Sequence, residues 1–123
     1  MSDLFELGKR GEALAWDFLR RHGYRILEKN YRTRFGEVDV IAQKGSTLVF
    51  LEVKTRRDQA FGQPEEAVDW RKRQKLARVA EAFLQAKKLE NLPARFDILS
   101  IIWDGVGEPQ FSLLEDAFSL EGA

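Results

Sequence analysis

Alternating and continuous runs of apolar residues predict a β-hairpin at the centre of the chain. Residues 38–42, VDVIA, form one predicted strand, and residues 47–55 form its partner, which contains the unbroken apolar run LVFL. The turn-forming residues Lys44-Gly45-Ser46 lie between the two strands. An apolar run of this kind indicates a strand that is covered on both faces, and therefore a central strand of a sheet.

Apolar residues at helical spacing lie on both sides of this hairpin. They predict an N-terminal helix that ends near His22, and a second helix with an apolar stripe over residues 76–84. Pro64 opens the second helical segment, and Asp69 is a further candidate N-cap where that segment could break.

Three more strands are predicted, over residues 24–34, 95–103 and 110–114, with a final turn or short helix over residues 114–123. The order of helix, three strands, helix and two strands predicts an α/β fold with a mixed sheet of about five strands flanked by helices. At 123 residues the chain is expected to form one domain, residues 1–123, with its own core.

The hairpin also carries charged side chains that alternation places on one face. Glu52 and Lys54 share a face of the second strand. A two-residue turn would place Glu37 opposite Glu52, with Asp39 as the diagonal neighbour, and a four-residue turn would place Asp39 directly opposite Glu52. A three-residue turn would instead place Asp39 opposite Leu51, on the wrong face.

In the two favourable registers Asp39, Glu52 and Lys54 converge on a covered part of the sheet. Two carboxylates in an apolar setting repel each other and lose hydration, which costs several kcal/mol. A lysine offsets part of this cost, and Mg²⁺ offsets more because it binds carboxylate oxygens. The plainer alternative is a solvated Glu–Lys pair at a strand end, with Asp39 facing water.

This arrangement of Asp39, Glu52 and Lys54 resembles the PD-(D/E)xK nuclease motif, although Val38 rather than proline precedes Asp39. Over about residues 8–118 the chain is similar to the YraN-like family, which resembles Holliday-junction resolvases. The resemblance implies a restriction-endonuclease-like three-layer domain. The segments that carry it are GKRGE (8–12), GEVDVIA (36–42), FLEVKTR (50–56) and RFDIL (95–99).

The resemblance implies a catalytic site with defined roles. Asp39 and Glu52 would hold Mg²⁺ or Mn²⁺ with the backbone carbonyl of Val53, and Lys54 would orient or deprotonate the attacking water. Glu12, from the GKRGE segment, would add a third carboxylate that acts in catalysis and binds the metal. Its alternative is an ordinary surface position on the first helix.

Three basic residues are candidates for contact with nucleic-acid phosphates. Arg56 and Arg57 directly follow the second hairpin strand, and Lys72 lies at the end of the second helix's apolar stripe that faces the sheet. The alternatives are an ordinary basic loop for the two arginines and a snorkelling side chain for Lys72. Asp97 is expected to form a structural ion pair with Arg95 or Lys72.

The tryptophans divide into two groups. Core packing is expected for Trp16 and Trp103, whereas Trp70 and Phe61 lie near the loop after the hairpin and are the candidates for base stacking.

Composition excludes several kinds of site. The chain has no cysteine and a single histidine, His22, so disulfides, thiolate metal sites and histidine-rich metal sites are excluded. It shows no signal peptide and no apolar stretch long enough to span a membrane, which predicts a cytoplasmic protein without a membrane partner. The formal net charge is zero, but residues 97–123 contain no lysine or arginine, an asymmetry compatible with one basic face elsewhere.

The sequence therefore predicts a metal-dependent endonuclease-like protein that acts on phosphodiesters of DNA, with branched DNA as one substrate class and no small-molecule substrate. A resolvase would act as a homodimer, because two strands must be cut. The alternative from another class is a nucleic-acid-binding or partner-binding module that keeps the nuclease fold without turnover. An RNA substrate is a third hypothesis.

Overall fold

The computed structural model describes residues 3–58 and 68–118, which form two helices and one sheet. The elements in chain order are α1 (Asp3–Arg21), β1 (Arg25–Thr33), β2 (Gly36–Lys44), β3 (Thr47–Arg56), α2 (Trp70–Lys87), β4 (Ala94–Ile102) and β5 (Gln110–Phe118). The strands are ordered β1-β2-β3-β4-β5 within the described residues. Among the strands that the structure describes, only β3 and β4 pair in parallel, so the sheet is mixed, as predicted.

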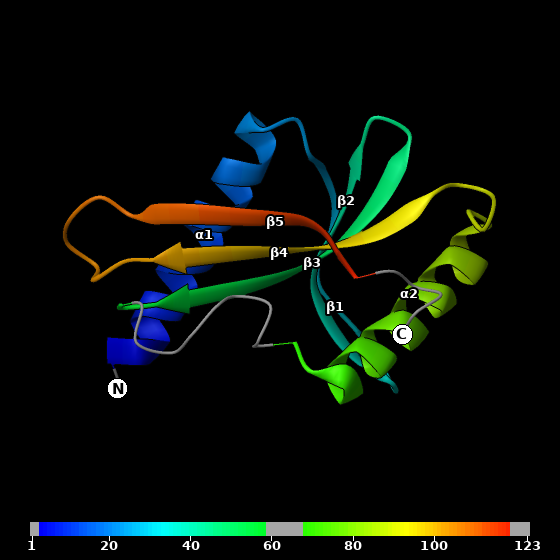
Figure 1. The fold of residues 1–123 in the computed structure, drawn as a ribbon, viewed down its shortest axis with the longest axis horizontal. Helices are drawn as coiled ribbons and strands as arrows, with labels where there is room; N and C mark the ends of the chain where they lie inside the picture. Colours follow the sequence, from blue (N-terminus) through cyan, green and yellow to red (C-terminus); the bar gives the residue numbers. More distant parts are fainter. Residues whose placement is uncertain (1–2, 59–67, 119–123) are drawn as a thin grey trace.

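The two helices cover opposite faces of the sheet and thus form three layers (Figure 1). Alternate residues of β3 belong to different apolar clusters: Leu48 and Phe50 pack on the α2 side, whereas Val49 and Leu51 pack on the α1 side. All four are buried, which confirms that β3 is a central strand. The predicted α/β fold with a mixed sheet of about five strands is therefore confirmed.

Helix α1 approaches β3 closely at one glycine. A Cβ on Gly11 would overlap the side chain of Thr55, whereas a Cβ on Gly8 would have nothing within 4 Å. Of these two glycines of α1, therefore, Gly11 is the one at which the helix lies close to the sheet. At the other end, Gly23 has a φ of +87° and the Tyr24 N–H donates to the Leu19 carbonyl, a Schellman-type end that stops the helix as predicted.

Helix α2 begins directly after Asp69, the N-cap candidate at which a break was predicted. The Asp69 side chain accepts from the Lys72 N–H at 2.9 Å, and the helix starts at Trp70. The segment opened by Pro64 lies outside the described residues, as does Phe61.

Strand β5 is longer than predicted. The predicted turn or short helix over residues 114–123 is wrong for its first part, because β5 continues to Phe118. An irregularity in the β4–β5 ladder near Asp97 permits this extension: Asp116 adopts a φ of +52° and its N–H donates to Asp97. Phe118 then stacks on Phe96, with ring centroids 4.4 Å apart.

A buried ion pair holds the start of β4. Asp97 is 1% exposed and accepts hydrogen bonds from the Arg95 guanidinium and from the Tyr24 hydroxyl at 2.8 Å. Arg95 also contacts Glu115 at 2.8 Å. This confirms the structural ion pair predicted between Asp97 and Arg95. Neither helix in the described part of the chain is long and apolar enough to cross a membrane.

Candidate functional site

The hairpin register places Asp39 and Glu52 across from each other. The β2–β3 ladder runs from the pair Lys44 and Thr47 to the pair Val40 and Leu51, and Asp39 and Glu52 are the next residues along the two strands. This is the alignment predicted for the four-residue turn. The turn itself is shorter, because Lys44 and Thr47 pair and leave only Gly45-Ser46, with Gly45 at a φ of +62°.

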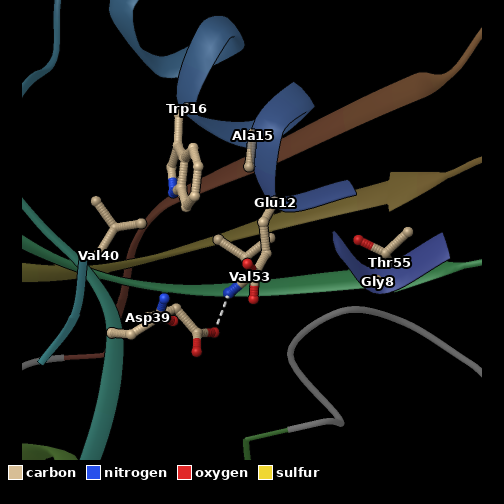
Figure 2. A pocket seen from close by; sticks show the side chains of 9 residues that line it. Gly8, Glu12, Ala15, Trp16, Asp39, Val40, Val53 and Thr55 are labelled. Carbon is tan, nitrogen blue, oxygen red and sulfur yellow. Dashed lines mark hydrogen bonds between the residues drawn. The ribbon is translucent and has the colours of Figure 1, made fainter. Parts of the chain in front are cut away.

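At the end of the β2–β3 ladder, the side chain of Asp39 accepts a main-chain hydrogen bond from β3. The Val53 N–H donates to the Asp39 carboxylate at 2.7 Å, and this interaction takes the place of the next main-chain bond (Figure 2). Burial raises the pKa of Asp39 to about 7, and the negative charge of Glu52 adds to the rise against the opposing hydrogen bond from Val53. The two carboxylates therefore form the mutually repelling pair that the sequence predicted.

The alternation of side chains breaks at Asp39. Val38 packs on the α2 side of the sheet, but Val40 packs on the α1 side, although regular alternation would place both on one face. Across the β1–β2 ladder, Asn30 lies opposite Asp39 and has a φ of +51°. This irregularity lets Asp39 line a cavity on the α1 side while its carboxylate stays close to Glu52, which lies on the α2 side with Phe50.

Glu52 is 6% exposed and has two lysine partners. Lys72 of α2 forms an ion pair with Glu52, and the Lys54 ammonium lies 3.8 Å from the same carboxylate oxygen. The structure shows Lys72 as a charge partner of Glu52, and its contact with a nucleic-acid phosphate stays a prediction. Lys54 occupies the predicted position beside Glu52.

The two lysines hold their protons differently. Burial lowers the pKa of Lys54, and the hydrogen bond and positive charge of Lys72 lower it further. Burial alone would lower the pKa of Lys72 too, but its hydrogen bond and ion pair with Glu52 outweigh burial and raise it. Lys54 is thus the lysine that releases its proton more readily.

Helix α1 forms the roof of the cavity on the other side of β3. The cavity measures about 170 Å³, and Glu12, Trp16 and Asp39 are among the residues that line it. Figure 2 shows the Glu12 side chain directed from α1 towards Val53 and Asp39. The contact between Gly11 and Thr55 fixes how closely this part of α1 approaches the sheet, and so fixes where Glu12 stands.

The oxygen atoms available at the candidate site are of the chemical type that a hard cation such as Mg²⁺ binds. Asp39 and Glu52 are paired carboxylates whose repulsion a cation would relieve, and the Val53 carbonyl is part of the same strand segment. Among the residues that the structure describes, however, no group of three or more acidic or histidine side chains is gathered closely enough to hold a metal. Glu12 shares the cavity with Asp39, and its role as a metal ligand stays a prediction.

The remaining predicted site and core residues are two arginines and two tryptophans. Arg56 and Arg57 follow Thr55 at the end of β3, and neither lines the cavity. Trp103 is buried, as predicted, and its indole N–H donates to the Gly107 carbonyl at 2.6 Å. Trp16 is partly buried and packs against the α1-side apolar cluster, as predicted, and it also lines the cavity, with the Lys29 ammonium 3.8 Å from the ring centroid.

Sequence reasoning missed Asn30. Its signal was weak: asparagine is among the few residues that readily adopt a positive φ, and one stands in the middle of a strand segment.

The chain matches the uncharacterised protein family UPF0102 over residues 11–101. It is 46% identical over 114 residues to a UPF0102 protein of Caldicellulosiruptor saccharolyticus, covering 92% of this chain and 97% of the other. A UPF0102 protein of Dictyoglomus thermophilum is 50% identical over 103 residues, covering 84% of this chain and 87% of the other.

Among solved structures, Pyrococcus furiosus SfsA in complex with Ca²⁺ aligns with a TM-score of 0.40 and 16% identity, covering 92% of this chain; the chain spans 64% of the length of that protein. The family match and the identity to these relatives show that the chain belongs to the UPF0102 family, the YraN-like proteins that its motifs resemble.

Proposed function

We propose that this protein is a metal-dependent endonuclease-like enzyme that hydrolyses phosphodiesters of DNA, including branched DNA. The observation that carries the proposal is the contact between the carboxylates of Asp39, which lines a cavity, and Glu52, which has Lys54 beside it. A protein that only needed a stable fold would gain nothing from two repelling carboxylates there. The resemblance to restriction-endonuclease-like domains supports the same reaction class.

The proposed roles follow from the donor atoms. Asp39, Glu52, the Val53 carbonyl and Glu12 would hold Mg²⁺ or Mn²⁺, which supplies positive charge against the scissile phosphate when bound. Lys54, whose pKa is lowered, would orient the attacking water or take its proton. Lys72 keeps its proton, and would move between Glu52 and a substrate phosphate.

Cleavage of a labelled substrate panel tests the proposal. The panel contains a four-way junction, a flap, a single strand and a plain duplex, each with Mg²⁺, Mn²⁺ or chelator. We expect metal-dependent cutting that is lost in Asp39→Ala and Lys54→Ala. Asp17→Ala is the matched control, because Asp17 is an exposed carboxylate of α1 that pairs with Arg21.

Two results would overturn the proposal. Cutting that survives both site substitutions would mean that the site is elsewhere, and no cutting of any substrate would remove the enzyme assignment. Preferred cutting of the junction would imply a homodimer with one site for each strand, which sedimentation would detect.

A second candidate function is a nucleic-acid-binding module without turnover. The observation that favours it is the Lys72–Glu52 ion pair, which already neutralises the buried carboxylate without a metal. Binding of the panel with no cutting in any metal would select this alternative.

A further inference from the structure

A basic groove lies beside the candidate site, between the β1–β2 turn and the first half of α2. The groove measures about 500 Å³, and its lining includes Arg34, Phe35, Trp70, Arg71, Lys75 and Arg78. The turn and the helix are in contact, because a Cβ on Gly36 would lie 3.8 Å from the Cβ of Lys75. Figure 1 shows α2 beside this end of β1 and β2.

All charged side chains that line the groove are basic. Arg71, Lys75 and Arg78 are spaced so that they share one face of α2, and Arg34 faces them from the turn. Within the described part of the chain, none of these four side chains has an acidic partner at ion-pair distance. Four cations gathered in one concave surface favour a polyanion as the ligand.

The groove also presents an aromatic ring to solvent. Trp70 is 68% exposed, although tryptophan is usually well buried. The ring of Phe35 is only partly buried, and the guanidinium groups of Arg34 and Arg78 lie 4.9 and 5.9 Å from its centroid. Basic side chains combined with an exposed aromatic ring are the features that bind unpaired nucleotides, by phosphate contact and base stacking.

The groove continues towards the carboxylates. A neighbouring cavity of about 380 Å³ shares Arg71 and Lys75 with the groove and adds Lys72, the ion-pair partner of Glu52. The acidic residues on this cavity already have partners, since Glu37 lies 3.5 Å from Arg32 and Asp69 caps α2. A chain of phosphates in the groove would therefore meet Lys72 and then the candidate site.

We propose that this basic groove binds an unpaired DNA strand of the substrate, with phosphates on Arg71 and Lys75 and a base stacked on Trp70. The inference rests on the proposed function for the identity of the substrate. It narrows that substrate to DNA with a single-stranded segment, because the bases of an intact duplex cannot stack on Trp70.

Binding in chelator tests the groove without any cleavage. The probe is a short labelled oligothymidylate, measured by fluorescence anisotropy over a series of salt concentrations, with an abasic oligomer of equal length beside it. We expect Trp70→Ala to weaken thymidylate binding about 5- to 150-fold, the range measured for loss of one stacked base. Abasic binding should hardly change, and Trp70→Phe should restore most of the affinity for thymidylate.

A double substitution of two basic residues in the groove tests the phosphate contacts. Arg71→Gln with Lys75→Gln should lower the slope of log affinity against log salt by about 1.4, or roughly 0.7 for each lost contact with a single strand. The matched control is Arg20→Gln with Lys87→Gln, which removes the same charge from exposed positions outside the groove. Circular dichroism of every variant checks that it folds.

The inference is overturned if Trp70→Ala binds thymidylate as the parent protein does, or if the groove pair and the control pair behave alike. Tighter binding of oligouridylate, or of the duplex, would overturn the assignment to unpaired DNA. The proposed function fails separately: groove-dependent binding without cutting leaves a binding module, and metal-dependent cutting that is indifferent to Trp70 leaves a nuclease with another strand path.

Discussion

Lys72 of α2 and Glu52 of β3 form an ion pair that links the helix to the buried carboxylate of the candidate site. Glu52 is 6% exposed, so it cannot rely on water to solvate its charge. Lys54 is the more distant of its two lysine partners, at 3.8 Å. The ion pair thus has two functions, one in stability and one in setting the charge of the site.

Replacing Lys72 tests the first function. We expect Lys72→Met to lower the free energy of unfolding by about 1–2 kcal/mol in urea, less than for a fully buried pair because Lys72 is partly exposed. Lys75→Met, at an exposed position on the same helix, should cost less than about 0.5 kcal/mol. Adding Glu52→Gln to Lys72→Met should recover part of the loss, and strict additivity of the two changes would contradict the pair.

The raised pKa of Asp39 predicts a pH dependence of stability. The folded pKa is about 7 and the ordinary value is 3.8, so between these pH values the folded chain holds a proton that the unfolded chain has lost. Stability should therefore fall as pH rises from about 4 to 7, by at most about 4 kcal/mol. Asp39→Asn should abolish this fall and be the more stable protein above pH 7.

Thermal unfolding at several pH values measures this effect, with Asp17→Asn as the control at an exposed carboxylate. Mn²⁺ should reverse the order above pH 7, because only the parent protein can gain stability from a cation bound to Asp39. Equal pH profiles for the parent protein and Asp39→Asn would show that Asp39 titrates at its ordinary pKa.

Gly11 and Gly8 provide a matched pair on one helix. Gly11→Ala should cost about 1–3 kcal/mol, because the new Cβ would overlap the Thr55 side chain. Gly8→Ala should be neutral or stabilise by up to about 1 kcal/mol, since a Cβ there meets nothing within 4 Å. Thr55→Ala should relieve much of the cost of Gly11→Ala in the double variant, and a lack of relief in urea unfolding would argue against this contact.

Tyr24 tests the structural role of Asp97. Tyr24→Phe should lower the free energy of unfolding by about 1–3 kcal/mol, because it removes a 2.8 Å hydrogen bond to a buried carboxylate. Tyr31→Phe is the control, since the Tyr31 ring packs edge-on against Phe83. Metal affinity, measured by calorimetry, should be the same in both variants, and a loss in Tyr24→Phe would connect Asp97 with the site.

The pairing of Asp39 with Glu52 could be predicted because strand alternation and turn length leave few registers. The choice between two of them could not be made from sequence, since the turn is two residues long yet the alignment is that of the longer loop. The break in alternation between Val38 and Val40 was also invisible. It lies beside Asn30 of the neighbouring strand, whose φ is +51°, and which residues of two strands lie side by side is tertiary information.

Helical periodicity correctly placed Lys72 on the side of α2 that faces the sheet. Periodicity does not show which residue the side chain contacts, because the partner of Lys72 depends on how α2 packs on the sheet. The length of β5 was underestimated for a related reason. Glu115 and Asp116 break the apolar pattern, and the strand continues past them because Asp97 and Arg95 bind there. In both places a charge–charge contact between distant segments decides the structure.

The candidate site draws on both layers of the protein. Glu12 of α1 lines the same cavity as Asp39 on one face of the sheet, and Lys72 of α2 pairs with Glu52 on the other, although the two helices pack on separate apolar clusters. A ligand bound by residues of both helices would connect α1 and α2 across the sheet. Occupancy should therefore slow amide hydrogen exchange in both helices together, because a bound ligand favours the conformation in which both helices are in place.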